Sequence, residues 1–309
     1  MTKSFFLYLS RSPRAQRFIM GLPLARRAAR RFVVGETLEE ALAAVSELNR
    51  EGMVATLDLL GEDISSPQEA ETSTREVASI LDGIQRTGVK SNLSLKLTQL
   101  GLRLGKEECR KNLETVLKRA FDHGNFVRID MEGSDVTEIT LQLFEEARRR
   151  FPNVGVVVQA YLRRTEKDVK ERLIPSGAAL RLCKGAYKEQ ADVAFPEKSA
   201  VDVNYRLLAD LLLAPEARAK GVKTAIATHD EAMIRHVVDK VERGELGKQD
   251  FEFQMLYGIR RDLQRQLAND GYRVRIYVSY GTRWYPYFMR RLAERPANVL
   301  FLVRNILRG

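Results

Sequence analysis

The sequence predicts a (βα)₈ barrel of the TIM type that is preceded by an N-terminal helical extension. Eight short β-rich runs alternate with eight longer helical patterns, as expected for a parallel sheet covered by helices. Gly61, Glu62 and Asp63 follow the first strand in place of a G-x-G-x-x-G turn, which disfavours an open, doubly wound nucleotide-binding sheet. No Pro-, Gly- or Ser-rich linker interrupts the chain. We therefore expect a helical extension over residues 1–50 and one barrel domain over residues 51–309.

The extension and the first four βα units follow from the spacing of apolar residues. Helical spacing predicts a helix over 36–51, which Gly52 ends. The valines of 154–158 do not alternate with polar residues, which is typical of a strand buried on both faces. The first four units are predicted as strands at 53–59, 91–97, 126–131 and 154–161, with helices at 67–86, 106–123, 136–150 and 166–173.

The second half of the chain keeps the same rhythm. Its predicted strands span 179–184, 223–228, 251–256 and 273–278. The helices that follow them are predicted at about 202–213, 231–243, 260–269 and 285–294. Eight βα pairs are the number that closes a barrel, and such barrels have about 250 residues or more.

The charge of the chain is strongly basic, at +10 for 309 residues, and it is concentrated early. Eight Lys and Arg residues precede the first acid, Glu36. This stretch has three interpretations: a cleaved transit peptide, a membrane-surface helix, or a solvated basic face on helices that pack against the domain. No apolar run approaches the roughly 20 residues that cross a bilayer, so we expect at most peripheral membrane contact.

The cysteines and histidines predict neither a disulfide framework nor a metal site. Cys109 and Cys183 lie in unrelated segments, and the three histidines are scattered. The spacing of His229 and His236 is not that of a zinc-protease helix. These features fit a cytoplasmic protein without a metal.

Polar residues occur where the predicted strands end, which is where barrel enzymes build their active sites. Each one could be a structural ion pair, but together they predict a site. The set offers no obvious nucleophile triad, and its mixture of cations, carboxylates, amides and tyrosines suits an anionic ligand that forms hydrogen bonds. The strand-end residues are Asp58, Glu62, Lys96, Asp130, Glu132, Gln159, Tyr161, Arg181, Lys184, Tyr187, Thr228, His229, Asp230, Gln254, Tyr277 and Tyr280.

The last helical pattern carries a pair of arginines. Arg290, Arg291 and Glu294 fall on one helix after a run of aromatic residues, and both arginines are spaced to reach Glu294. They could form a surface ion pair worth well under ~1 kcal/mol. Alternatively, the two guanidinium groups could bind a carboxylate through planar, bidentate donors.

Six ordered motifs at the strand ends resemble those of the proline dehydrogenase family. They are SLKLTQLG (94–101), RIDME (128–132), RLCKGAY (181–187), ATHD (227–230), EFQMLYG (252–258), and RIYVSYG with YPYFMRRLAERPAN within 275–298. The resemblance begins at TLDLLGE near Thr56 and covers nearly the whole chain. Ser279 and Cys183 depart from the residues usual in the family, which have proline and valine there.

The resemblance implies a monofunctional bacterial enzyme that oxidises L-proline to 1-pyrroline-5-carboxylate, the first step of proline catabolism, with hydride transfer to FAD. It implies that Asp130 and Arg181 are catalytic, with Arg181 near the flavin N5. It implies that substrate is bound by Lys96, Tyr277, Arg290, Arg291, Glu62 and Glu294, with Glu62 as a gate that pairs with the clamp arginine. The cofactor positions it implies are Met131, Gln159, Arg181, Lys184, Gly185, Ala186, Tyr187, Thr228 and His229.

The resemblance also implies that a membrane quinone re-oxidises the flavin and that a separate pyrroline-5-carboxylate dehydrogenase takes the product. One alternative is another FAD-bearing barrel of the folate-reductase type, which nicotinamide would reduce. The basic charge raises nucleic acid as a second alternative, but the strand-end motifs have mixed charge and no recognition helix is evident, so we expect no nucleic-acid partner.

Overall fold

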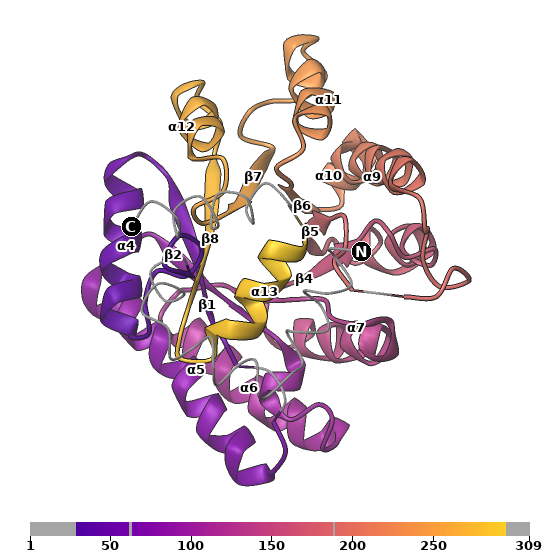
Figure 1. The fold of residues 1–309 in the computed structure, drawn as a ribbon. Helices are drawn as coiled ribbons and strands as arrows, with labels where there is room; N and C mark the ends of the chain where they lie inside the picture. Colours follow the sequence, from indigo (N-terminus) through magenta and orange to yellow (C-terminus); the bar gives the residue numbers. More distant parts are fainter. Residues whose placement is uncertain (1–28, 62–63, 188, 295–309) are drawn as a thin grey trace.

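The computed structural model describes residues 29–61, 64–187 and 189–294, and it confirms the predicted barrel. Eight parallel strands close in the order of the sequence, and β1 pairs with β8 through partners such as Thr56 and Tyr277. Figure 1 shows the strands at the centre with helices around them. The strands are β1 (Val54–Leu59), β2 (Ser91–Leu95), β3 (Val127–Ile129), β4 (Val154–Gln159), β5 (Ala179–Cys183), β6 (Lys223–Ala227), β7 (Phe251–Leu256) and β8 (Val274–Tyr280).

Helices follow every strand, as the alternating pattern predicts. Two short segments were not anticipated: η1, which directly follows β2, and α10, which follows α9. The segments are α4 (Leu38–Arg50), α5 (Pro67–Thr87), η1 (Leu97–Leu100), α6 (Lys106–Asp122), α7 (Ser134–Arg148), α8 (Thr165–Asp168), η2 (Val169–Leu173), α9 (Lys198–Leu213), α10 (Pro215–Ala219), α11 (Glu231–Glu242), α12 (Arg261–Asn269) and α13 (Trp284–Glu294).

Local sequence explains where the first helices begin. Thr37 and Glu40 form a capping box on α4, in which each side chain accepts a hydrogen bond from the other residue's backbone N–H. Ser66 caps α5 by accepting from the Glu69 N–H, and Pro67 occupies the first turn, where its missing N–H costs nothing. The predicted helix over 36–51 is thus confirmed as α4. The predicted extension upstream of residue 29 lies outside the described residues.

Some element boundaries differ from the sequence prediction. The second strand ends at Leu95 and not at residue 97, because Lys96 already begins the 3₁₀ turn of η1. The last strand continues beyond residue 278 to Tyr280, because its end pairs with Leu59 of β1 and with the segment at Val33. The helix predicted over 166–173 changes to π-helical geometry at η2.

The main hydrophobic core lies between the strands and the surrounding helices. Leu57, Leu93, Leu95 and Ile129 are fully buried there. The residues that alternate with them on the strands face the interior of the barrel and are largely polar, Asp58, Ser94 and Asp130 among them. This polar interior leads to the carboxyl ends of the strands.

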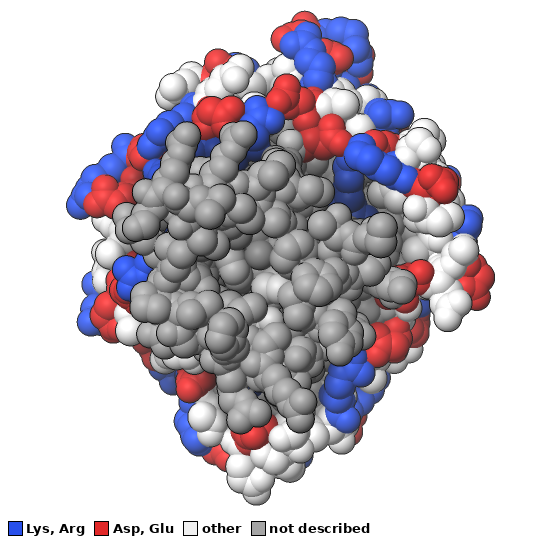
Figure 2. Space-filling model, in the orientation of Figure 1, with Lys and Arg blue, Asp and Glu red and all other residues white. Residues whose placement is uncertain are grey.

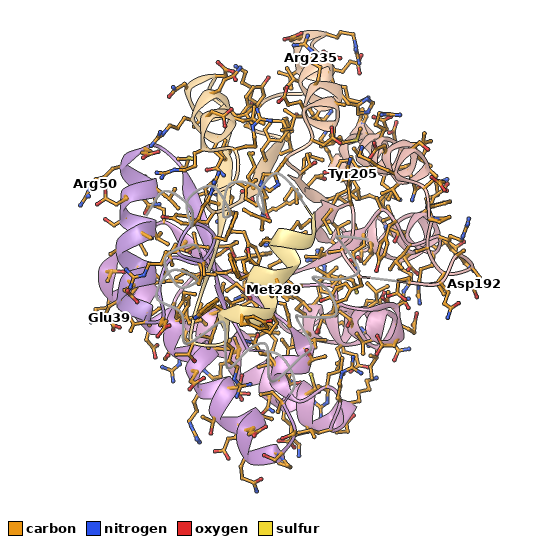
Figure 3. The ribbon with its side chains drawn as sticks, viewed as in Figure 1. Glu39, Arg50, Asp192, Tyr205, Arg235 and Met289 are labelled. Atoms are coloured by element: carbon orange, nitrogen blue, oxygen red, sulfur yellow. The ribbon has the colours of Figure 1, made fainter. Side chains whose placement is uncertain are left out.

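A separate hydrophobic cluster holds α13. It joins Ala29, Phe32 and Val33, upstream of the barrel, to Trp284 and its aromatic neighbours on α13. Figure 1 shows α13 in front of the strands, across the view down the barrel. In Figure 3, Met289 of α13 lies near the middle of this view, whereas Arg235 and Asp192 lie at the edge. The last helix therefore crosses the barrel and is not part of the surrounding ring.

The surface of the described residues mixes the two signs of charge. In Figure 2, Lys and Arg side chains alternate with Asp and Glu around the visible rim. None of the helices within the described ranges combines the length and the apolar character that a membrane span requires.

Candidate active site

A cavity of about 660 Å³ opens at the carboxyl ends of the strands. Every residue that the family resemblance implies for the site, and whose side chain the structure describes, lines this cavity. These residues are Lys96, Asp130, Met131, Gln159, Arg181, Lys184, Gly185, Ala186, Tyr187, Thr228, His229, Tyr277 and Arg291. Of the other predicted strand-end residues, Asp230 and Gln254 also line it, whereas Asp58, Glu132, Tyr161 and Tyr280 do not. The structure therefore brings together groups from strands β2 to β8 and from helix α13.

Asp130 is the centre of a buried hydrogen-bond network in this cavity. Its Oδ1 accepts from Arg181 Nη1 at 2.5 Å and from Ser94 Oγ at 2.7 Å, and its Oδ2 accepts from the Tyr277 hydroxyl at 2.6 Å. Burial, together with the nearby carboxylates of Asp130 and Asp58, raises the pKa of Tyr277 well above its usual value, so the phenol keeps its proton and donates. The network holds the two side chains next to each other, with the guanidinium carbon of Arg181 5.2 Å from the centre of the Tyr277 ring.

Lys96 is held beside this network by a second carboxylate. Its Nζ lies 3.1 Å from Asp58 Oδ1 and 4.0 Å from Asp130 Oδ2. Asp58 is completely buried, and its Oδ2 accepts from Ser279 Oγ at 3.3 Å. Burial raises the pKa of Asp58, while the charge of Lys96 acts in the opposite direction. Lys96 thus lines the cavity with its amino group held in place and its positive charge partly compensated by Asp58.

The side-chain amide of Gln254 also holds Arg181 in place. Its Nε donates to Gln254 Oε1 at 2.5 Å, and Gln254 Nε2 donates to Glu252 Oε1 at 2.5 Å. Glu252 is in turn paired with Arg275 at 2.8 Å. This series of hydrogen bonds sets the orientation of the Gln254 amide, so the amide oxygen faces the guanidinium group of Arg181.

Lys184 stands on the other side of the cavity between two carboxylates, Asp202 and Asp230. Asp230 Oδ2 is 2.6 Å from Lys184 Nζ, and its Oδ1 caps α11 by accepting from the Ala232 N–H. Burial would raise the pKa of Asp230, but the hydrogen bond and charge of Lys184 outweigh it and lower the pKa to about 2. Asp202 escaped the sequence prediction because it comes from the side of a helix, α9, and not from a strand end.

Backbone conformation makes the loop after β5 depend on glycine. Gly185 has φ of 110°, and a Cβ there would lie 2.1 Å from Tyr161 Cδ1. Only glycine can lie this close to the tyrosine ring in that conformation. The neighbouring Cys183 has its thiol near the Val158 carbonyl, and burial raises its pKa to about 12, so it stays protonated and is no nucleophile at neutral pH.

His229 is oriented by the backbone of the next strand. The Leu256 N–H donates to His229 Nε2 at 2.9 Å, so this nitrogen carries no proton. The proton of the neutral ring is then on Nδ1. His229 can then donate a hydrogen bond from Nδ1 in a direction set by the orientation of its ring.

Arg291 reaches the cavity from α13, with its guanidinium carbon 5.1 Å from the centre of the Tyr287 ring. Contact with an aromatic ring restricts the orientation of the guanidinium group. Three other expected residues cannot be placed: Glu62 lies outside the described residues, and the side chains of Arg290 and Glu294 are not described.

The sequence of this chain matches a known protein family. The model of a family described as proline dehydrogenase matches residues 41–304. The chain belongs to the proline dehydrogenase family. Proline dehydrogenase 1 of Bacillus subtilis subsp. natto is 42% identical over 310 residues and is matched over its whole length, as is this chain. Proline dehydrogenase of Deinococcus radiodurans is 42% identical over 288 residues, which cover 91% of this chain and 90% of the relative.

Proline oxidation, the first step of proline catabolism, is the activity of this family, and these long matches are to the monofunctional bacterial type. The bifunctional protein PutA of Escherichia coli is 29% identical, and the match covers 24% of its length. The crystal structure of proline utilization A from Bdellovibrio bacteriovorus superposes with a TM-score of 0.81 at 28% identity, over 87% of this chain and 33% of that one. The barrel architecture is thus shared with the PutA proteins.

Proposed function

We propose that this cavity binds FAD and L-proline and that the chain oxidises proline to 1-pyrroline-5-carboxylate. In this reaction a hydride leaves the carbon beside the ring nitrogen, and a proton leaves the nitrogen. The observation that carries the proposal is the convergence of Lys96, Asp130, Arg181, Tyr277 and Arg291 on one cavity, although they are far apart in the sequence.

The described residues fit FAD in charge and shape. A diphosphate needs cations, and Lys184 lines the cavity, while Met131 supplies apolar surface for an aromatic ring system. Arg181 lines the same cavity and offers a positive charge to the ring system. Bound FAD would supply the acceptor for the hydride. We assign it to Met131, Gln159, Arg181, Lys184, Gly185, Ala186, Tyr187, Thr228 and His229.

The side chains of this protein would position the substrate. Lys96 and Arg291 offer two cations to the carboxylate of proline, and Tyr277 packs against the pyrrolidine ring. Asp130 fixes Arg181 and Tyr277 through the hydrogen bonds given above, and the positive charge of Arg181 would favour hydride transfer to a bound cofactor. Fixed geometry of this kind contributes much of the rate when no strong nucleophile is required.

We further assign Arg290 to the same carboxylate, with Glu294 beside the arginines. We assign Glu62 to a gate that closes over the substrate by pairing with the clamp arginine. These three assignments depend on the sequence motifs alone.

Rapid mixing under anaerobic conditions tests the proposal against the folate-reductase alternative. L-proline should bleach the visible band of the flavin, and NADH should do so poorly. Bleaching by NADH alone, with none by proline, would show that the chain is a different flavin-dependent barrel.

We propose that a membrane quinone re-oxidises the flavin and that a separate pyrroline-5-carboxylate dehydrogenase takes the product. A soluble quinone analogue should support steady-state turnover with proline. Turnover with artificial dyes but with no quinone analogue would contradict the proposed acceptor.

We also propose that residues 1–50 form a helical extension to the 51–309 barrel, that the protein is cytoplasmic, and that the basic N-terminal stretch contacts anionic membrane. Co-sedimentation with vesicles containing anionic lipid should fall when the first 30 or so residues are removed. If the full chain and the truncated form sediment equally with the vesicles, the N-terminal stretch does not contact the membrane.

A further inference from the structure

A second cavity of about 580 Å³ opens at the opposite end of the barrel, where the strands begin. Ser91, Lys223 and Phe251, the first residues of β2, β6 and β7, lie in its wall. Nothing in the proposed oxidation of proline uses this cavity. Its charge is unbalanced, with five cations against two acids, namely Lys90, Arg128, Lys223, Arg273 and Arg275 against Asp250 and Glu252.

Among the described residues inside the barrel, most cationic side chains lie next to a carboxylate, and Arg128 does not. Three interior cations each lie within ion-pair distance of a carboxylate: Lys96 with Asp58, Arg181 with Asp130, and Arg275 with Glu252. Arg128 of β3 has no carboxylate within 4.0 Å among the residues that the structure describes. This cation lines the second cavity, as does Arg275 with its partner Glu252.

Arg128 is buried to 95% and only partly hydrogen-bonded. Both of its hydrogen bonds start from Nη1, which donates to the Ala179 carbonyl at 2.6 Å and to the Val156 carbonyl at 3.2 Å. Its Nε is buried and has no hydrogen-bond partner among the described residues. A guanidinium group carries five N–H donors, so donors remain beyond those that Nη1 uses.

The surroundings make room for this side chain, although no carboxylate of the described residues contacts it directly. A Cβ on Gly155 would lie 2.5 Å from Arg128 Nη1, so glycine leaves the space that the guanidinium group occupies. The Phe126 ring lies 5.0 Å from the guanidinium carbon. Burial, and then the charges of Arg181 and Arg275, lower the pKa of Arg128 to about 9, while the carboxylates of Glu252 and Asp130 act in the opposite direction without cancelling the shift.

An unpaired buried charge is costly, and a mobile counter-ion that enters the open cavity would remove most of that cost. The acceptor must be small enough for the cavity and must offer several oxygens to N–H donors. A tetrahedral oxyanion meets both conditions. Lys223 and Arg273 at the rim would raise its local concentration.

We propose that the cavity at the amino-terminal end of the barrel binds a small inorganic oxyanion of the phosphate type, with Arg128 as its buried ligand. The site is separate from the candidate active site and does not depend on the proposed function. The simpler alternative is that Arg128 only ties β4 to β5 through their carbonyls, and this alternative predicts no response to anions.

Thermal unfolding of the full chain, with the same excess of FAD added to both buffers, in phosphate and in chloride of equal ionic strength, tests the site. Phosphate at about 100 times its Kd should raise the unfolding midpoint on the order of 5 °C, because it binds only the folded state. The rise should disappear in Arg128→Gln and persist in the control Arg75→Gln, which removes an exposed arginine of α5. No rise in the unmodified protein, or an equal rise in Arg128→Gln, would overturn the proposal.

A crystallographic measurement on the unmodified protein covers the case in which Arg128→Gln does not fold. Crystals soaked in arsenate, which mimics phosphate and scatters anomalously, should show a peak in this cavity beside Arg128. Peaks only elsewhere, or none, would overturn the site.

Discussion

Replacing Asp130 with asparagine should destabilise the protein strongly, because it breaks a buried ion pair from one side only. The Asp130 and Arg181 side chains are 11% and 7% exposed, and their atoms meet at 2.5 Å. Asparagine keeps the shape of the side chain but removes its charge. The carboxylate now accepts three hydrogen bonds, and the amide N–H₂ of asparagine, itself a donor, would face at least one of the same three donor groups. Removal of one partner from a buried pair costs about 3–5 kcal/mol, because the other charge remains uncompensated.

Urea unfolding at pH 7, with matched flavin content, measures this loss as a lower free energy of unfolding at an unchanged slope. The control is Glu71→Gln, which breaks the exposed pair with Arg75 at 2.6 Å and should cost about 0.3–0.5 kcal/mol. A loss for Asp130→Asn no larger than that of the control would refute the assignment of Asp130 as the buried counter-charge of Arg181.

Three other substitutions test separate parts of the structure. Gly185→Ala should lower the ratio of flavin to protein absorbance, because its Cβ would collide with Tyr161 at a φ of 110°. Asp230→Asn should keep the cap of α11 but lose the ion pair with Lys184; the folded-state pKa of about 2 lies below the ordinary 3.8, so its contribution is present above pH 4 and is lost between pH 4 and 2. Thr37→Ala should cost about 1 kcal/mol in urea unfolding through loss of the capping box.

Each of these substitutions has a control or an outcome that would contradict it. Gly221→Ala has the same kind of φ, at 87°, with nothing within 4 Å of its Cβ, so it should leave flavin content unchanged. A difference in stability between the unmodified protein and Asp230→Asn that is the same at pH 2 and pH 7 would contradict the pKa argument. Thr115→Ala, at an exposed position in the middle of α6, should leave the free energy of unfolding unchanged. If Thr37→Ala also left it unchanged, the cap would not contribute to stability.

The strands could be predicted from the sequence because each is a short apolar run next to a helical pattern, and their order then follows from barrel closure. Element ends were less predictable, since they depend on pairing. Ser279 and Tyr280 resemble the start of a turn, yet Leu59 holds Tyr280 in the sheet. The short α10 had an unused sequence signal, the proline at position 215 followed by helix-forming residues and by Gly221.

The members of the site were predictable because strand ends meet at one rim, but their partners were not. Ser94 lies on β2 two residues before Lys96, which directly follows the strand, and this spacing was the signal that Ser94 shares the interior with Asp130. The contribution of Asp202 comes from the packing of α9, which no local pattern encodes. Which carboxylate pairs with Lys96 depends on the register of β1 against β2, a property of the closed barrel.

The most direct test of the convergence at the cavity is an anaerobic titration of the flavin with L-proline, in the unmodified protein and in Arg291→Met. Arg291 comes from α13, the element farthest in sequence from Lys96, and loss of a buried contact to a carboxylate costs about 3 kcal/mol, or about 100-fold in affinity. The account predicts equal flavin content in both proteins and half-bleaching of the variant only at about 100 times more proline. Bleaching of both at the same proline concentration, or no retention of FAD by either, would contradict it.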